Sequence, residues 1–590
     1  MSPLSAYVGT TEAAPMLLGG LARLGDDHDA TGIAVWSARG DVAMTRVIGS
    51  TVLHPADFRA GDDARIGIAH VGCGTRARAR RRDVQPLVDC TERLHVVQDG
   101  TISNAASLRA GLLADGHAFL SDDAAEVVAH LLEEALEHAG SVALALAATV
   151  PSLDGAWSIV ALDGETGEVA ASAAGSPLML GERDDDMLLA SHAASLAPHC
   201  SSVRLLARGD VVSIATGAVR WLRLGRERAA PPLVAIQPQL RGHDVGDDRH
   251  RDEIEDQPRA AARVLEAIGS SVADGSLWRA LPLRPLDRVA FVGSGSALHA
   301  GRVAAAVLSD LGGVPTRWMR PADVATASLE PGTLLVGLGG SDDSSTLRRA
   351  VDAPSARGLQ LLVLAHAHHS PLSRVADAAL DWLAPPEVGA AAATFVGQAI
   401  TGVAVALSAL VASGRLDRAS AAAHAAMLHE TPSRLHDAIA GSTREVTALV
   451  EELRDHSSFL VVGTGSGLPY AAEGALQLQQ LAARWAHHHP ASDLLGSRSR
   501  VVDASMGAFV VDSGTDDVDD AIAYLVASGA RVLRIGGRRA DIGVAVRRGR
   551  NGRGVPWDAT PWGPIEAIVP MQLFARELGR ELGVAGPPAG

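Results

Sequence analysis

Lysine is absent from this sequence of 590 residues, so arginine supplies all 52 of its basic side chains. A lysine Schiff base and a lysine general base are therefore both excluded as catalytic devices in this chain. Aromatic residues are also scarce, at 3% of the total. The hydrophobic cores must consequently be built from alanine, valine, leucine and isoleucine.

Cysteine is nearly absent as well. The three cysteines, Cys73, Cys90 and Cys200, lie far apart and do not have the spacing of a metal-binding motif. This usage predicts a reducing compartment and no disulfide framework. We accordingly expect no metal ion and no other cofactor.

Positive charge is in short supply, because the formal net charge is −16. An acidic chain is a poor partner for nucleic acid or for an anionic membrane surface. The N-terminus lacks a basic stretch followed by an apolar run, and no uninterrupted apolar run reaches about 18 residues. The sequence therefore predicts a cytoplasmic protein that binds neither nucleic acid nor a membrane.

The length predicts about three domains. Residues 1–225 alternate short apolar runs with turns, and two segments have apolar residues at the spacing of a helix, which together predict a layered α+β domain. The expected strands are 32–36, 65–70, 94–97, 157–162 and 210–214, and the expected helices are 14–24 and 123–139. Residues 226–270 are expected to form a polar linker, up to about residue 250, followed by a helix over 253–268.

From residue 271 onward, apolar runs alternate with long alanine-rich segments, which predicts parallel sheets covered by helices. The expected strands are 289–292, 334–338, 361–365, 459–462, 508–511, 531–535 and 565–570. The segments VAFVGSGSALHAG at 289–301 and FLVVGTGSGLPYAAEG at 459–474 are alike. This internal repeat of about 170 residues is too long for a solenoid unit, so we expect two α/β domains, over 271–425 and 426–590.

Each repeat opens with a glycine- and serine-rich loop between a strand and a helix. Free backbone N–H groups at a helix N-terminus favour anions, and Ser294, Ser296, Thr464 and Ser466 could add hydroxyl donors. Phosphate is the expected ligand. The alternative is a tight turn whose small residues serve packing alone, and the sequence leaves both interpretations open.

Several segments carry a resemblance to a known family. These are SPLSAYVG at 2–9, AGSPLMLG at 174–181, DEIEDQP at 252–258 and AAEGALQLQQL at 471–481. With the domain order, they resemble glucosamine-6-phosphate synthase, or glutamine–fructose-6-phosphate aminotransferase. The resemblance implies a class II glutamine amidotransferase domain of the Ntn-type αββα fold, followed by two sugar-isomerase (SIS) domains with parallel sheets. It also implies a sugar phosphate ligand and a homodimer formed through the SIS domains.

Four positions that the resemblance assigns to glutamine hydrolysis have changed. The nucleophilic cysteine is replaced by Ser2, and the arginine that clamps glutamine's carboxylate is replaced by Gly72. The asparagine of the oxyanion hole becomes Asp99, which would place a carboxylate where negative charge develops. The aspartate that binds glutamine's amine becomes Ala124. We therefore expect no glutaminase activity.

The sugar site is eroded in the same manner. The isomerase base falls at Gln480, whose amide has no useful basicity; a lysine falls at Gln477 and the ring-opening histidine at Gly496, while Glu473 survives. The hydroxyls of a second phosphate loop survive at Ser341, Ser344 and Thr346, beside the acidic pair 342–343. The resemblance also implies an imine-forming lysine near the C-terminus, and this sequence offers no lysine as its counterpart.

A run of three histidines, His487, His488 and His489, lies near the expected sugar site. We interpret it as a solvated or interface loop in preference to a metal site, although histidine can also supply acid–base chemistry. Two functions remain open. One is a pseudoenzyme that binds a sugar phosphate and regulates or assembles with a partner. The other is a repurposed biosynthetic enzyme that uses Ser2, Glu473 or the three histidines. A third interpretation, an active aminotransferase, conflicts with the missing residues.

Overall fold

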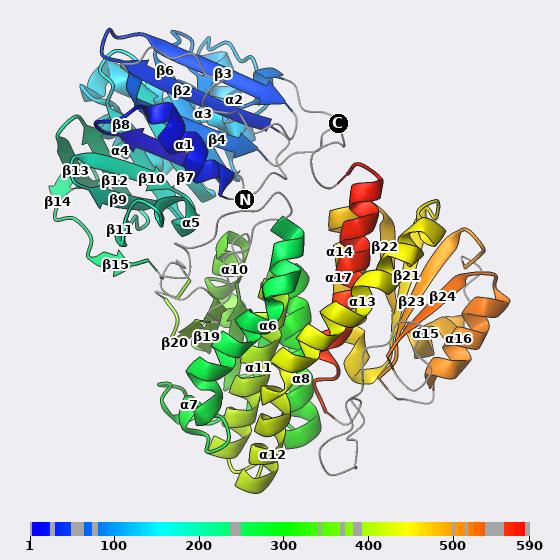
Figure 1. The fold of residues 1–590 in the computed structure, drawn as a ribbon. Coiled ribbons are helices and arrows are strands. Elements are labelled where there is room, and N and C mark those ends of the chain that lie inside the picture. Colours follow the sequence, from blue (N-terminus) through cyan, green and yellow to red (C-terminus); the bar gives the residue numbers. More distant parts are fainter. Residues whose placement is uncertain are drawn as a thin grey trace. The chain divides into compact units, whose positions relative to one another are not determined.

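The computed structural model describes residues 3–23, 30–48, 64–72, 81–236, 249–339, 344–365, 372–373, 375–381, 392–497, 502–513, 517–536 and 560–584. The chain divides into two compact units. The first contains residues 1–245 with the short segments 344–348 and 368–374, and the second contains the other residues from 246 to 590 (Figure 1).

Two antiparallel sheets form the centre of the first unit. The eight-stranded sheet has the order β15-β11-β9-β10-β1-β4-β2-β3, and the seven-stranded sheet has the order β14-β13-β12-β8-β7-β6-β5. The strands of the first sheet are β1 (Leu4–Val8), β2 (Ala30–Ser37), β3 (Val42–Ile48), β4 (Ala64–Gly72), β9 (Met179–Arg183), β10 (Asp186–Ala190), β11 (Ser202–Leu205) and β15 (Leu233–Ala235). Those of the second are β5 (Leu87–Val88), β6 (Leu94–Ile102), β7 (Gly155–Asp163), β8 (Val169–Ala174), β12 (Asp210–Ala215), β13 (Ala218–Arg223) and β14 (Arg226–Arg228).

Helices lie outside both sheets of the first unit. They are α1 (Ala13–Ala22), α2 (Ala105–Ala114), α3 (Ala124–Ala139), α4 (Val142–Thr149) and α5 (Ala193–Leu196). One buried cluster contains residues of both sheets, among them Ile68 of β4 and Val160 of β7. A second cluster packs α3 and α4 on the seven-stranded sheet, and α1 contacts β1 and β4. The predicted αββα layering is confirmed.

Helix α3 begins and ends where its sequence directs. The Asp123 side chain caps the N-terminus by accepting a hydrogen bond from the Ala125 N–H at 2.8 Å. The helix ends at Gly140, whose φ of 71° is left-handed, a conformation that glycine adopts without strain. One face, including Val128 and Leu132, is buried.

Two parallel sheets form the second unit. The first has the order β17-β16-β18-β19-β20 and the second β22-β21-β23-β24. The strands are β16 (Arg288–Val292), β17 (Thr316–Met319), β18 (Thr333–Leu338), β19 (Gln360–Ala365), β20 (Ala378–Asp381), β21 (Ser458–Gly463), β22 (Trp485–Pro490), β23 (Met506–Val511) and β24 (Arg531–Ile535). In both sheets the first strand pairs on its two sides with the next two strands of the chain, so the repeat predicted from sequence is one α/β topology used twice.

The repeat extends to the backbone of the two loops. Gly295 in the first loop and Gly465 in the second occupy the same position, and both have positive φ, at 50° and 46°. Helix α8 (Gly295–Gly312) follows the first loop and α14 (Leu468–Ala482) the second. The remaining helices are α6 (Arg249–Ile268), α7 (Ser276–Arg279), α9 (Pro321–Val324), α10 (Ser344–Val351), α11 (Ala392–Ala412), α12 (Arg418–His429), α13 (Thr431–Leu453), α15 (Ala491–Ser497), α16 (Asp517–Ala527) and α17 (Ile568–Glu581).

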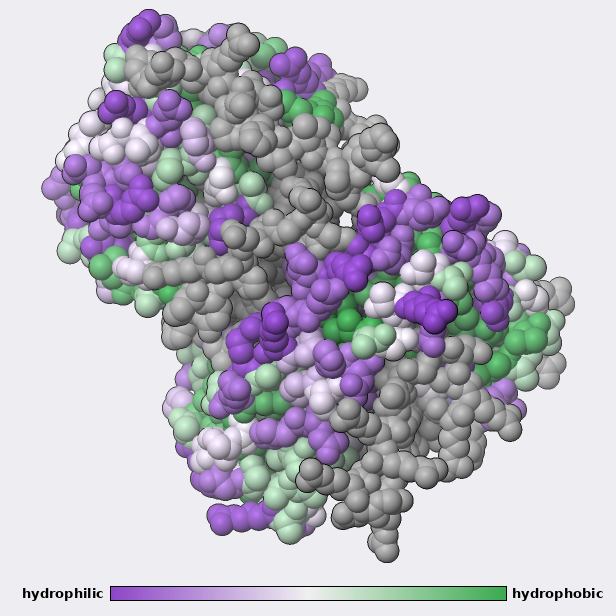
Figure 2. Space-filling model, viewed as in Figure 1, coloured by the Kyte–Doolittle hydropathy of each residue, from purple (hydrophilic) through white to green (hydrophobic). Residues whose placement is uncertain are grey.

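Helix α11 forms the centre of the helical layer beside the first parallel sheet. It packs on α8 and α6, and a Cβ at Gly402 would lie 3.0 Å from the Ala304 Cβ, so the two helices approach closely. Its segment Thr394–Ala412 is long and apolar enough to cross a membrane, but 89% of it is buried inside the protein. Hydrophilic residues, by contrast, line the outer faces of α6 and α13 in Figure 2.

Three predictions about local structure are wrong. Residues 565–570, predicted as a strand, form a 3-10 turn and the start of α17, which is buried among other helices. The three histidines expected in a loop lie on β22, an edge strand. The stretch 226–236, expected to be linker, contributes β14 and β15 to the edges of the two antiparallel sheets.

Candidate functional site

The second unit buries a carboxylate where its two halves meet. Glu473 lies on α14, facing α8 from the first half, and it is 0% exposed. Burying an ionised carboxylate is costly unless hydrogen bonds or a countercharge compensate for its lost hydration. The surroundings of Glu473 therefore decide what the site can do.

Three side chains contact the Glu473 carboxylate. The Ser296 hydroxyl donates to Oε1 at 2.8 Å, and the Gln477 amide donates to the same oxygen at 2.8 Å. The His299 Nδ1 lies 2.8 Å from Oε2. Ser296 and His299 are three residues apart on α8, and Glu473 and Gln477 are four residues apart on α14, so each pair shares one helix face. Both carboxylate oxygens are thus engaged.

The edge strand β22 brings histidines next to this cluster. The His488 ring lies 6.4 Å from the His299 ring, edge to face. Burial, with smaller effects from Arg302 and the neighbouring histidines, lowers the pKa of His488 to about 4. Burial also lowers the pKa of His489. His488 is therefore a neutral imidazole and a weak base at pH 7, which can donate a hydrogen bond from one ring nitrogen and accept one at the other.

The two histidines that flank His488 do not converge with it on one point. His487 is exposed, whereas His488 and His489 are partly buried. The rings of His487 and His488 are stacked with centroids 5.6 Å apart, and those of His487 and His489 lie 5.0 Å apart. Among the described residues, this run does not meet the geometry of a metal site.

The hydroxyls predicted to bind phosphate have different surroundings. Ser296 is buried and its proton is directed at Glu473, so it faces the carboxylate. Thr464 is buried, with its hydroxyl 2.7 Å from that of Ser513, which donates to the Thr464 carbonyl at 2.8 Å. Ser294 and Ser466 are partly buried at the two loop turns.

The second predicted phosphate loop lies only partly within the described residues. Ser341 is outside them, as is the side chain of Ser344. Thr346 is partly buried in the first turn of α10. The structure accordingly brings together the first loop and Glu473, but it says nothing of how the second loop meets them.

Two of the positions at which the resemblance predicts lost isomerase groups are exposed. Gln480 is exposed on α14, two turns away from Glu473. Gly496 is exposed on α15, and a Cβ at this position would have no neighbouring atom within 4 Å. Gln477 is the exception, because it is fully buried and holds Glu473 in place.

The predicted glutaminase positions lie in the first unit. Gly72 ends β4, beside the start of β1, where the Val71 N–H donates to the Pro3 carbonyl at 2.8 Å. A side chain at Gly72 would have room, because the nearest atom to an ideal Cβ is 3.8 Å away. Ser2 lies outside the described residues.

The oxyanion and amine-binding positions are built differently. Asp99 is buried on β6, followed by Gly100, whose φ is 88° and whose Cβ would lie 2.3 Å from the Ala156 carbonyl oxygen. Only glycine fits at this point of β6, next to the position where the resemblance predicts an asparagine. Ala124 is the first residue of α3, and the adjacent Asp123 is already used as the cap of that helix.

Two residues of the site were missed from sequence. His299 stands in the motif that opens the first repeat, and its spacing from Ser296 placed it on the same helix face, so it could have been found. Ser513 follows β23 at the carboxyl edge of the sheet, where open α/β sheets bind ligands, but its contact with Thr464 depends on tertiary structure.

Comparison with known proteins follows the same domain order. Residues 76–198 match the glutamine amidotransferase domain family and residues 283–410 match the SIS domain family. The chain is 30% identical over 597 residues to a glutamine–fructose-6-phosphate aminotransferase (isomerizing) of Acidithiobacillus ferridurans, an alignment that spans 96% of this chain and 95% of that one. The chain belongs to the glutamine–fructose-6-phosphate aminotransferase family. The enzyme of the same name from Symbiobacterium thermophilum is 27% identical over 98% of this chain and 96% of its own.

A solved structure is similar in part. The C-terminal domain of glucosamine-fructose-6-phosphate aminotransferase from Francisella tularensis has a TM-score of 0.46 and 20% sequence identity, and the match covers 59% of this chain and 99% of that one. In this family member, an N-terminal glutamine amidotransferase domain is thus followed by SIS domains with parallel sheets.

Proposed function

We propose that this member of the aminotransferase family binds a sugar phosphate in its SIS domains without carrying out the amidotransferase or isomerase reaction, and acts as a regulatory or assembly subunit. The observation that carries the proposal is the enclosure of Glu473. Its two oxygens are already engaged by Ser296, Gln477 and His299, so it is not positioned as a free base.

Two further features support this proposal. The position of the isomerase base holds Gln480, which is exposed and lacks basicity. The chain contains no lysine that could form a sugar imine. The binding function rests instead on the retained loops, with Ser294, Thr464 and Ser466 at the turns before α8 and α14 and the second loop contributing Ser341, Ser344 and Thr346.

A repurposed enzyme is the second candidate, and His488 favours it. This neutral imidazole, with its pKa lowered to about 4, lies beside the His299–Glu473 pair. Such a group can hydrogen-bond a substrate through either ring nitrogen, and the adjoining carboxylate of Glu473 can take up a proton. In this proposal His488 and Glu473 act together on a sugar-phosphate-like metabolite, and His487, His489 and Ser2 are further candidates.

The test combines turnover with binding. Purified protein is mixed with glutamine and fructose 6-phosphate, and mass spectrometry follows glutamate and amino-sugar phosphate, while calorimetry measures binding of fructose 6-phosphate with inorganic phosphate as reference. We expect binding and no turnover. Glutamate together with an amino-sugar phosphate would overturn the loss of activity. A new product without glutamate would favour the second candidate, and the absence of both binding and turnover would overturn sugar phosphate binding.

Two variants locate the binding site. Thr464→Val removes a hydroxyl at the second loop and should weaken binding by about tenfold, the effect expected for one hydrogen bond of about 1.5 kcal/mol. Thr447→Val, on the exposed face of α13, is the matched control and should bind as the parent does. Equal binding by both variants would place the ligand elsewhere.

The assembly and the domain limits are part of the proposal. We take the amidotransferase-like domain as 1–225 together with the edge strands β14 and β15 that follow it, the linker and helix as the rest of 226–270, and the SIS domains as 271–425 and 426–590. We further propose a cytoplasmic homodimer formed through the SIS domains. Light scattering on the purified chain should give twice the monomer mass of 60.8 kDa, and a monomer would contradict this.

A further inference from the structure

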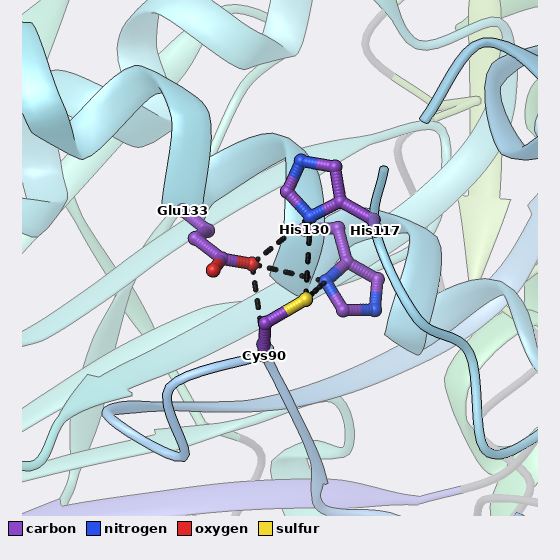
Figure 3. A group of neighbouring side chains, drawn as sticks. All are labelled: Cys90, His117, His130 and Glu133. Carbon is purple, nitrogen blue, oxygen red and sulfur yellow. Dashed lines mark hydrogen bonds and ion pairs between the residues drawn. The ribbon is translucent and has the colours of Figure 1, made fainter. Parts of the chain in front are cut away.

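Four potential metal ligands converge in the first unit, away from the positions discussed above. They are Cys90, in the turn between β5 and β6; His117, after α2; and His130 and Glu133, three residues apart on α3. Figure 3 shows the thiol, the two rings and the carboxylate turned toward a common centre. Their ligand atoms all lie within 4.8 Å of one another.

The distances match a tetrahedral zinc site. The Cys90 Sγ lies 3.5 Å from the Nδ1 of His117 and 3.5 Å from the Nδ1 of His130. The Glu133 Oε2 lies 3.2 Å from the first of these nitrogens and 3.1 Å from the second. Zinc bonds of about 2.3 Å to sulfur and about 2.0–2.1 Å to nitrogen or oxygen, at tetrahedral angles, separate sulfur from nitrogen by about 3.5 Å and nitrogen from oxygen by about 3.3 Å.

The second nitrogen of His117 strengthens the argument. Its Nε2 lies 3.2 Å from the Glu134 Oε1, while its Nδ1 faces the Glu133 Oε2. A neutral imidazole has one N–H, so it can donate to one carboxylate only, and its other nitrogen then directs a lone pair at an oxygen. A cation bound to Nδ1 removes this conflict, and a carboxylate behind the ligating histidine is the usual support of a zinc ligand.

The side chain of His130 is also fixed by its neighbours. His130 is 1% exposed, and the Phe119 ring packs edge-on against it with centroids 4.5 Å apart. Its Nε2 is buried and has no hydrogen-bond partner among the described residues; the Glu126 Oε1 lies 4.0 Å away. Glu126 is itself fixed by the backbone N–H groups of Leu120 and Ser121.

From these contacts we infer a binding site for a zinc-class divalent cation, with Cys90, His117, His130 and Glu133 as its four ligands. Four protein ligands leave no open position, so the ion is structural and ties two loops to α3. The mixture of one sulfur, two imidazole nitrogens and one carboxylate oxygen suits Zn²⁺ better than Mg²⁺ or Ca²⁺, which prefer all-oxygen sites.

The test uses the full chain, stripped with a chelator and then titrated with Zn²⁺ and separately with Co²⁺. We expect a single equivalent of zinc per chain, and a cobalt complex with intense tetrahedral d–d bands and a thiolate charge-transfer band. Cys90→Ser should remove the charge-transfer band, and both Cys90→Ser and His117→Ala should weaken zinc binding by about tenfold or more.

His138→Ala is the matched control, because His138 is an exposed histidine on the same helix. It should bind zinc as the parent does. Zinc binding by the parent chain no stronger than the buffer background, an octahedral cobalt spectrum, or unchanged affinity in Cys90→Ser would each overturn the site. Circular dichroism of each variant checks its fold, and the cobalt spectrum of the parent chain tests the site even if a variant does not fold.

Discussion

The positions that the resemblance assigns to glutamine hydrolysis and those that it assigns to the sugar site have opposite surroundings. At the predicted glutaminase positions there is little side chain: Gly72 leaves room for one, and Ala124 is the first residue of α3. At the sugar site, the surviving Glu473 is enclosed by three partners and is fully buried.

This difference indicates how strongly the stability of each region depends on the residues at its site. Gly72 has no side chain and Ala124 has only a methyl group, so substitutions at these two positions should cost the fold little. The Glu473 cluster joins α8 to α14, so each of its members supports the interface between the two halves. Substitutions should therefore have large effects in the second region and small ones in the first.

The largest effect should follow Glu473→Ala. It leaves the buried Gln477 and Ser296 and the partly buried His299 without their common acceptor, which typically costs about 3–5 kcal/mol in unfolding free energy. The midpoint of urea unfolding, followed by circular dichroism, measures the loss. Glu445→Ala, on the exposed face of α13, is the control and should leave the midpoint unchanged. If both variants unfold at the same urea concentration, Glu473 does not hold the halves together.

Replacing two glycines of one sheet by alanine should change the stability of the first unit to different extents. A Cβ at Gly32 on β2 would lie 1.9 Å from the Gln85 carbonyl oxygen, whereas at Gly72 on β4 the nearest atom is 3.8 Å away. Gly32→Ala should destabilise the first unit by about 1–3 kcal/mol through overpacking. Gly72→Ala should be neutral or stabilise by up to about 1 kcal/mol. Thermal unfolding midpoints compare the two variants. Equal midpoints would contradict the difference in available space between Gly32 and Gly72.

The stability of both units should depend on pH, and this effect should be smaller than those of the substitutions above. Burial lowers the pKa of His95 in the first unit to about 4 and that of His488 in the second to about 4, against about 6.5 in the unfolded chain. Between these values the unfolded chain binds more protons, so stability is complete above pH 6.5 and falls as pH drops toward 4.

The thermal midpoint at pH 7 and pH 5 measures this dependence. His95→Gln should flatten it for the first unit and leave that of the second unchanged, whereas His138→Gln, at an exposed position, should alter neither. A pH dependence that persists fully in His95→Gln would show that another group is responsible.

The smallest effect should follow Gln480→Glu, which restores the carboxylate at the position of the family's base. The side chain is exposed, so stability should change by no more than about 0.5 kcal/mol. Without lysine in the chain, amino-sugar formation should remain absent in the turnover assay. Recovered turnover would indicate that only this one group had been lost.

Much of the fold could be predicted from sequence, because the apolar runs of the central strands are unambiguous. Arg531–Ile535 was predicted with its observed bounds, and the repeated glycine-rich loops located both halves. The failures share a cause. The edge strand β22 carries three polar histidines, of which His487 is exposed and the other two are partly buried. The apolar run 565–570 is buried as a 3-10 turn and the start of a helix by its neighbours. Periodicity over so few residues cannot reveal either outcome.

The sites were less predictable. Glu473 was singled out through resemblance, but its enclosure depends on α8, which lies 177 residues earlier in the chain for the Ser296 contact. The four residues around Cys90 have no recognisable spacing, because two come from loops and two from α3. Only the packing of α3 on its sheet brings them together.

The apolar helix α11 should make the unfolded chain prone to aggregate. Nineteen residues with the character of a membrane span, Thr394–Ala412, are hidden only by tertiary structure. When the second unit is unfolded, during synthesis or on heating, this segment exposes an apolar surface that other copies can bind. Such exposure is typical of partly folded chains. Heated protein should therefore aggregate before it can refold, and its survival will be set by how fast it opens.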